Sequence, residues 1–268
     1  MAALLNTVRS TPALRASVWL HAAAIGGAVA WPPAWPVAAG AIAANHLALA
    51  TAGLWPRSRL LGPNRTRLSA ASRARGEFAI TLDDGPEPAI TAEVLRILDR
   101  FGARASFFVI GSRLRQHPDL GREILARGHS LENHSGTHRH DFSLLGPAGL
   151  ARELRTGQQA IRDVGGNAHY FRAPMGLRNP FLDAQLRDQE MQLVSWTRRG
   201  FDTLAQDAAR VEARLVRRLA AGDILLLHDG NAGQSSAGQP LVLDVLPRLL
   251  ETARRCGLSA VDLPTGLA

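Results

Sequence analysis

The sequence predicts an α/β protein whose main part is a barrel of parallel strands. Short β-favouring runs alternate with helical stretches from residue 77 onward, and there are seven such runs. This alternation is typical of parallel sheets covered by helices. No Gly-x-Gly-x-x-Gly motif follows the first run, which favours a barrel over a dinucleotide-binding sheet. An apolar segment of different character precedes the alternating part.

Each element of the barrel is predicted from its periodicity and its flanking residues. The predicted strands are 78–82, 105–110, 129–134, 168–173, 191–196, 223–228 and 258–263. The predicted helices are 90–102, 120–128, 150–166, 179–189, 207–222 and 240–257. Glycines 102, 128, 165 and 222 stand where helices are expected to end. The polar segment 229–239 is expected to form a flexible loop at the rim.

Two apolar runs, Ala16 to Trp31 and Val37 to Trp55, precede the barrel and flank the turn sequence PPAWP. Each is close to the ~20 residues that cross a bilayer as a helix. Trp19 and Trp55 are expected at one interface and the tryptophans of the turn at the other, as aromatic belts. We predict a membrane hairpin that contacts the bilayer through residues 16–55. A cleaved signal peptide and an Ala-rich helical pair packed on protein are the alternatives.

The net positive charge of the chain lies in the segment that contains these apolar runs. Residues 1–75 contain eight arginines and no acidic residue, whereas the remaining residues hold 23 arginines and 23 acids. This pattern is typical of membrane proteins and disfavours a nucleic-acid partner. The positive-inside rule places Arg9, Arg15 and the arginines from Arg57 to Arg75 in the cytoplasm. We therefore expect an inner-membrane protein of bacterial type with a cytoplasmic catalytic domain, the periplasmic face being the alternative.

The domain boundary is predicted where the composition changes. Residues 1–75 form the membrane-associated hairpin and a basic linker, and residues 76–268 form the catalytic barrel. Cys256 is the one cysteine, which excludes an internal disulfide and leaves the redox compartment open.

Polar residues stand at the carboxyl ends of several predicted strands. Asp83 and Asp84 end the first strand, and His134 ends the third. In a parallel barrel these ends meet on one face, where active sites are built. His134 and His138, four residues apart on an expected helical turn, can aim two imidazoles at one point. With one aspartate they make a three-ligand metal site with an open position, and the other aspartate is free to act as a base.

Two further strand ends carry groups that suit this site. Arg172 is expected beside the aspartates, where its positive charge would offset and fix their negative charge. The alternative is a surface arginine. His228 follows an apolar strand, where a hydrogen-bonded core histidine is the alternative. Asp202 can bond His228 and hold its tautomer.

Five short motifs, in order, resemble those of the polysaccharide deacetylase family, which includes chitooligosaccharide and peptidoglycan N-acetylglucosamine deacetylases. They are TLDDGP, HSGTH, FRAPMG, WTRRGFD and LLLH, and the resemblance covers roughly residues 77–263. It implies a distorted (β/α)7 barrel and a metal-dependent hydrolase that removes an N-acyl group, most often N-acetyl, from an amino sugar in a glycan or glycolipid. Leu82 stands where the family has Phe, and Thr203 stands where it has Trp. Because that Trp helps to shape the substrate groove, Thr203 leaves the identity of the substrate undetermined.

The resemblance also implies a role for each site residue. Asp84, His134 and His138 would bind a divalent metal, zinc first and cobalt, nickel or manganese as alternatives. Asp83 would be the general base, positioned by Arg172.

The same resemblance implies which residues would protonate the leaving group, contact the acetyl group and stabilise the oxyanion. His228, supported by Asp202, would be the general acid. Leu226 would line the pocket for the acetyl methyl group. The backbone N–H of Met175 would help to form the oxyanion site.

Three rival functions remain open. A deformylase or deacylase of a lipid-linked sugar and an O-acetyl esterase use the same scaffold, and the expected cytoplasmic topology favours a lipid carrier over mature cell wall. A membrane-tethered sugar-binding protein with a dead site is disfavoured because every polar group of the site is present. A basic membrane-surface module without an enzyme is disfavoured by the balanced charge of the barrel.

Overall fold

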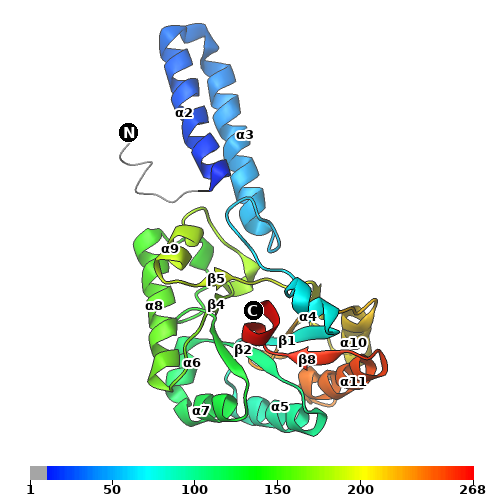
Figure 1. The fold of residues 1–268 in the computed structure, drawn as a ribbon. Helices are drawn as coiled ribbons and strands as arrows, with labels where there is room; N and C mark the ends of the chain where they lie inside the picture. Colours follow the sequence, from blue (N-terminus) through cyan, green and yellow to red (C-terminus); the bar gives the residue numbers. More distant parts are fainter. Residues whose placement is uncertain (1–10) are drawn as a thin grey trace.

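The computed structural model describes residues 11–268, which form an α/β barrel with a helical hairpin projecting from it (Figure 1). The hairpin consists of α2 (Pro12–Ala30), the short η1 (Pro32–Ala34) and α3 (Trp35–Leu54). Thr11 caps α2 by accepting a hydrogen bond from the Leu14 N–H. Arg9, which contributed to the predicted orientation, lies outside the described residues.

The hairpin buries little of its surface within the protein. Only 6% and 11% of the two apolar stretches is buried, and Val29 and Val37 are 78% and 76% exposed. Both helices are long and apolar enough to span a bilayer, on length and composition alone. An apolar surface of this extent requires a cover of lipid or protein.

One prediction about the hairpin is wrong in detail. The helix α2 begins at Pro12, four residues before the predicted apolar run, so Trp19 lies inside the helix and not at its end. Trp55 does lie at the end of α3, as its C-cap residue. The two helices contact each other through polar pairs, with Asn45 donating to the Ser17 hydroxyl at 2.8 Å and the rings of His21 and His46 meeting at 3.2 Å.

The barrel confirms the predicted fold class. All seven predicted strands occur, and a further short strand, Arg198–Arg199, was not predicted because two residues carry no periodicity. The strands are β1 (Glu77–Asp83), β2 (Ala105–Val109), β3 (Ser130–Asn133), β4 (Tyr170–Phe171), β5 (Gln192–Leu193), β6 (Arg198–Arg199), β7 (Ile224–His228) and β8 (Ser259–Val261). Their order in the sheet is β5-β4-β3-β2-β1-β7-β6, all paired in parallel, and β8 pairs with the start of β1.

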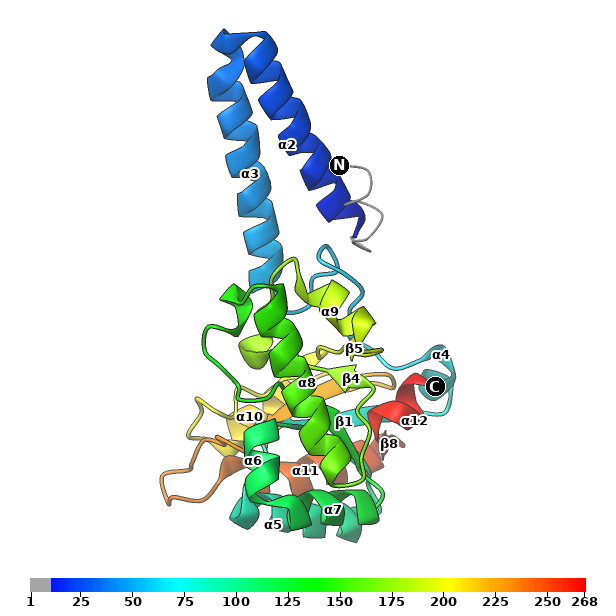
Figure 2. The ribbon, with the colours of Figure 1, turned by 90° about the vertical axis from the view of Figure 1, so that its left-hand side faces the viewer.

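Helices cover the outer face of this curved sheet (Figures 1 and 2). The main ones are α5 (Pro88–Phe101), α6 (Gly111–Gln116), α7 (Pro118–Ala126), α8 (Pro147–Asp163), α9 (Leu182–Asp188), α10 (Ala208–Val216) and α11 (Leu241–Arg255). The shorter α4 (Ala70–Ala74), α6 and α12 (Leu263–Leu267) were not predicted, because so few residues show no helical period.

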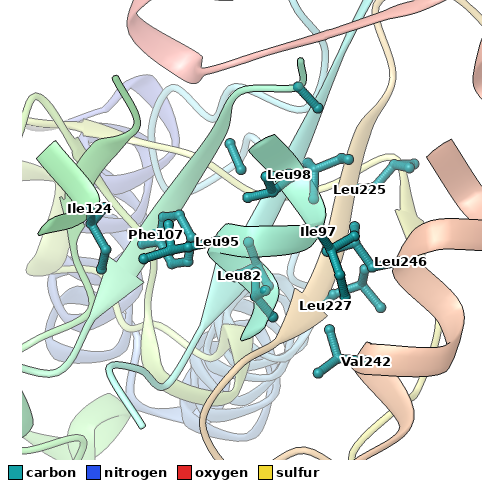
Figure 3. Packing of buried hydrophobic residues seen from close by; sticks show 14 of the residues in the cluster. Leu82, Leu95, Ile97, Leu98, Phe107, Ile124, Leu225, Leu227, Val242 and Leu246 are labelled. Atoms are coloured by element: carbon teal, nitrogen blue, oxygen red, sulfur yellow. The ribbon is translucent and has the colours of Figure 1, made fainter. Parts of the chain in front are cut away.

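The core follows from the two-residue alternation of the strands. Leu82 of β1 and Leu225 and Leu227 of β7 face outward and pack against α5 and α11 (Figure 3). The intervening residues face the barrel interior, where Ala79, Phe108 and others form a smaller cluster. The alternation therefore directs the polar residues of β1 and β7 inward.

The linker after the hairpin runs down the open side of the barrel. Within residues 11–268, β5 and β6 do not pair with each other. Instead the Arg65 N–H donates to the Leu193 carbonyl at 2.9 Å, and the Leu68 N–H donates to the Gly222 carbonyl at 2.9 Å. The linker thus covers the seam that makes the barrel distorted.

Candidate active site

The strand register places base and acid candidates beside each other at the carboxyl end of the barrel. Thr81 and Asp83 of β1 face the interior, between residues that pack outward. In the parallel pairing of β1 with β7, Asp83 lies opposite His228 and Thr81 lies opposite Leu226. All four side chains are buried.

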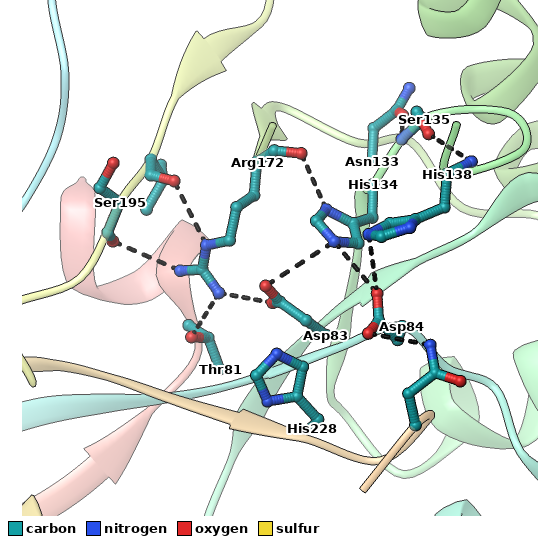
Figure 4. A network of polar contacts seen from close by, with 12 residues as sticks. Thr81, Asp83, Asp84, Asn133, His134, Ser135, His138, Arg172, Ser195 and His228 are labelled. Atoms are coloured by element: carbon teal, nitrogen blue, oxygen red, sulfur yellow. Dashed lines mark hydrogen bonds and ion pairs between the residues drawn. The ribbon is translucent and has the colours of Figure 1, made fainter. Parts of the chain in front are cut away.

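Asp84, His134 and His138 come together as the sequence predicted (Figure 4). The Asp84 Oδ1 atom lies 3.3 Å from the His134 Nε2 and 3.2 Å from the His138 Nε2. The three ligand atoms lie within 4.8 Å of one another. Within the described chain, this buried oxygen accepts no hydrogen bond. A carboxylate oxygen and two imidazole nitrogens that converge in this way fit a divalent cation such as zinc.

His134 is held in the tautomer that metal binding needs. Its Nδ1 lies 2.8 Å from the Arg172 carbonyl oxygen, which can only accept, so Nδ1 carries the proton. In the neutral ring, which is the form that binds a metal, the lone pair of Nε2 therefore faces Asp84.

The prediction of a helical turn between His134 and His138 is wrong. Residues 134–138 form a loop after β3, in which Ser135 and His138 have left-handed φ angles of 71° and 52°. The Asn133 Oδ1 accepts from the Ser135 N–H at 2.8 Å, and the Ser135 hydroxyl accepts from the His138 N–H at 2.9 Å. These side chains bend the loop back on itself, and this bend brings the second imidazole to Asp84.

The charges of the cluster are set by burial and by mutual contact. Burial acts to raise the pKa of Asp84, but its close contact with His134 and the positive charge of the surrounding histidines hold that pKa well below its usual range. Burial acts to lower the pKa of His134, but the charges of Asp83 and Asp84 raise it overall. Burial and the charge of His134 lower the pKa of His138. Asp84 is therefore ionised, as a metal ligand must be.

Arg172 fixes the orientation of Asp83. The guanidinium is 1% exposed, and its Nη1 donates to the Asp83 Oδ1 at 2.6 Å and to the Thr81 hydroxyl at 2.7 Å. Two backbone carbonyls after β5 accept its remaining donors, and the Phe108 ring lies 4.0 Å below it. This contact leaves the other oxygen, Asp83 Oδ2, 3.9 Å from the His134 Nε2 and free of Arg172.

His228 forms a buried pair with Asp202. The His228 Nδ1 lies 2.9 Å from the Asp202 Oδ1, and the His228 N–H donates to the Asp202 Oδ2 at 2.8 Å. Burial acts to lower the pKa of His228, but the hydrogen bond and charge of Asp202 raise it overall. A histidine with a raised pKa holds a proton that it can give to a leaving group.

One cavity of about 210 Å³ joins these groups. Met175 and Leu226 lie in its wall, together with Asp83, His228 and Thr203. The cluster of Asp84, His134 and His138, called the metal-type cluster below, also lines the cavity. Met175 has a left-handed φ of 56°. In the described residues its N–H forms no hydrogen bond, whereas the next two N–H groups bond back to Ala173 and Pro174.

Two residues of the site were not predicted. The Asn231 Nδ2 donates to the Asp84 Oδ2 at 3.2 Å, and the Arg113 guanidinium donates to the Asp84 carbonyl and to the Asn231 Oδ1 at 2.8 and 2.9 Å. Asn231 lies in the segment 229–239, for which the sequence predicted only a flexible polar loop at the rim. Its position three residues after His228 is the one signal in the sequence that points to it.

The fold and the site together define a class of protein: a barrel hydrolase whose active-site face has a place for a divalent metal. A family model described as polysaccharide deacetylase matches residues 71–194. The chain belongs to the polysaccharide deacetylase family, as its motifs predicted, and is a hydrolase of that type.

Three relatives illustrate the similarity. A chitooligosaccharide deacetylase from Bradyrhizobium is 34% identical over 56% of this chain and 69% of the relative. A peptidoglycan-N-acetylglucosamine deacetylase from Bacillus cereus is 31% identical over 66% of this chain and 84% of the relative. The crystal structure of a family 4 carbohydrate esterase from Streptomyces lividans, in complex with acetate, is 31% identical and has a TM-score of 0.64 over 72% of this chain and 96% of the other.

Proposed function

We propose that the protein removes the N-acetyl group from an N-acetylglucosamine-type amino sugar in a glycan or glycolipid. The observation that carries the proposal is the convergence of three parts on one cavity: the cluster of Asp84, His134 and His138, the arginine-held Asp83, and the carboxylate-held His228. The named activities of the two sequence relatives agree with this chemistry.

Asp84, His134 and His138 would hold the metal, with zinc as the first choice. When bound, such a cation acts as a Lewis acid and acidifies water toward a pKa of about 7. Asp83 accepts the proton of the attacking water, because Arg172 occupies its Oδ1 and leaves Oδ2 for this task. The ion pair between Arg172 and Asp83, 2.6 Å long, also holds the carboxylate in place.

The other wall of the cavity completes the reaction. The Met175 N–H donates to the developing oxyanion. His228 gives its proton to the amine nitrogen, which is otherwise a very poor leaving group. Leu226, buried in the wall, contacts the acetyl methyl group. Asp202 acts through His228, whose tautomer and charge it maintains.

The test is release of acetate by the full chain, loaded with zinc, from chitooligosaccharides and from peptidoglycan fragments. O-acetylated sugars form a second arm, because an esterase would prefer them. Release from the N-acetyl substrates that stops on chelation supports the proposal. Preference for the O-acetyl substrates would replace it with the esterase function, and no turnover on any of these substrates or on a lipid-linked N-acetyl sugar would support a dead binding site.

Asp202→Asn is expected to shift the alkaline side of the pH–activity profile to lower pH. Asp202 raises the pKa of His228, so its neutralisation lowers that pKa, and the protonated acid is lost earlier as the pH rises. The measurement is kcat/KM against pH for both proteins. The exposed Asp207→Asn, which lies on the same segment, serves as the control. An unchanged alkaline limit in Asp202→Asn would remove His228 from the acid role.

We also propose that α2 and α3 insert into a membrane with the barrel on the cytoplasmic side. The exposed apolar surface of the hairpin and the arginines that flank it, with no acidic residue in positions 1–75, support this. A reporter that is active only in the cytoplasm is expected to be active when it is fused after Ala268. Activity of an exported-type reporter at the same site would reverse the topology.

A further inference from the structure

The base of the hairpin is docked on the rim of the catalytic cavity. The Arg178 N–H donates to the Gly53 carbonyl at 3.1 Å, and the Ser195 hydroxyl donates to the Pro56 carbonyl at 2.6 Å. Gly176, next to Met175 of the cavity wall, lies so close to Pro56 that a Cβ there would meet it at 3.0 Å. The end of α3 therefore contacts the same loops that form the active site, as the meeting of α3 with the barrel in Figure 2 indicates.

Three hollows follow one another from α3 to the catalytic groups. The first, of about 790 Å³, lies along α3 and is lined mainly by alanine, leucine and Trp55 before it reaches Arg57. The second, of about 540 Å³, shares Trp55 and Arg57 with the first and extends to Phe201. The third is the catalytic cavity, which shares Trp196 and Arg199 with the second.

Two arginines mark the junctions between these hollows. Within residues 11–268 neither Arg57 nor Arg199 forms an ion pair. Arg57 is exposed and makes one long contact, 3.4 Å, to a backbone carbonyl. The Arg199 Nε is buried without a partner, and its guanidinium lies over the rings of Trp196 and Phe201 at 5.6 and 5.0 Å. Guanidinium groups without a carboxylate partner are complementary to a phosphate.

The catalytic cavity is small for a whole glycan or glycolipid, so we expect most of the substrate to lie outside it. At about 210 Å³ it is smaller than the roughly 300–1,000 Å³ of most ligand sites. The second hollow shares Trp196 and Arg199 with it and reaches α3, whose Leu47 and Leu54 are 69% and 66% exposed. From α3 toward the catalytic cavity, the protein presents first the apolar surface of α3, then Arg57 and Arg199, and then the metal-type cluster.

We propose that the substrate is an N-acetyl amino sugar carried on a polyprenyl phosphate, and this rests on the proposed deacetylase function. The lipid chain lies along α3 in the bilayer, the phosphate lies between Arg57 and Arg199, and the sugar enters the catalytic cavity. Water adds across the amide C–N bond, acetate leaves, and the free amine stays on the lipid-linked sugar. The hairpin is then part of the substrate site as well as an anchor.

The experiment compares three substrates with the full-length, zinc-loaded protein in detergent micelles. They are polyprenyl-phosphate-linked N-acetylglucosamine, N-acetylglucosamine 1-phosphate and the N-acetylglucosamine trisaccharide. We expect kcat/KM for the lipid-linked substrate to exceed that for the 1-phosphate at least tenfold, chiefly through KM. Arg57→Gln and Arg199→Gln are each expected to lower kcat/KM for the lipid-linked substrate by about tenfold, as the loss of a charge-assisted hydrogen bond does.

Arg100→Gln is the matched control, because Arg100 is an exposed arginine on α5, far from the hairpin. This variant is expected to leave kcat/KM for all three substrates unchanged. Arg57 is exposed, so a melting temperature equal to that of the unmutated protein separates lost binding from lost folding. Equal kcat/KM for the lipid-linked and soluble substrates, with no effect of Arg57→Gln, would overturn the inference and leave the deacetylase function standing. Acetate release from none of the three would overturn the proposed function itself.

Discussion

Asp83→Asn is expected to remove nearly all acetate release while the protein keeps its metal. The loss should be about 10²–10⁴-fold in kcat, the usual contribution of a positioned general base. Asparagine retains an oxygen that accepts from Arg172, so the side chain keeps its place but has no basic oxygen for the proton of water. Asp84, His134 and His138 are unchanged, so the metal content should be unchanged too.

The measurement pairs turnover with metal content and thermal stability. Leaving Arg172 without any partner would cost about 3–5 kcal/mol, as for other broken buried ion pairs, and the asparagine is chosen to limit this cost. Asp119→Asn is the control, because the Asp119 carboxylate is 95% exposed on α7. Full activity of Asp83→Asn would transfer the base role to another group, and a parallel loss of metal would place Asp83 among the ligands.

His134→Ala is expected to lose both the metal and the activity. His134 supplies an imidazole nitrogen 3.3 Å from the Asp84 carboxylate, so its removal leaves one carboxylate and one imidazole in the cluster. Loss of an outer-shell partner already costs about 10–100-fold in metal affinity, so loss of a ligand should cost more. The measurement is zinc retained after dialysis against a metal buffer, which gives a result independent of turnover.

His140→Ala is the matched control for this variant. His140 belongs to the same loop, two residues after His138, but is exposed and lies outside the cluster. Its replacement should change neither zinc retention nor acetate release. Zinc bound by His134→Ala as tightly as by the unmutated protein would mean that the metal site lies elsewhere.

Most of the barrel is predictable because its elements carry their own period. The β1 segment is buried from its second residue onward and ends at Asp83, and the helices α5, α8 and α11 have one apolar face each. Elements of two to five residues, such as β6 and α4, escape prediction because they exist only through the neighbours on which they pack. The helical turn predicted for His134 to His138 failed for a related reason, because side chains of Asn133 and Ser135 bend that loop instead.

The sequence by itself determined the class of fold and the composition of the site. Asp83, Asp84, His134, Arg172 and His228 each stand at or just after the carboxyl end of a predicted strand, and these ends share one face of a parallel barrel. That rule needs no knowledge of contacts between distant segments, so the constellation was open to inference from the chain alone.

Tertiary structure decided how the site is held and what borders it. Asn231 reaches Asp84 across 147 residues of chain, and Pro56 meets Ser195 across 139. Such contacts depend on how the closed barrel, its seam and the hairpin fit together, and no local pattern of residues encodes that fit. The position of α3 beside the catalytic cavity, from which we infer a lipid-carried substrate, is therefore a property of the folded protein.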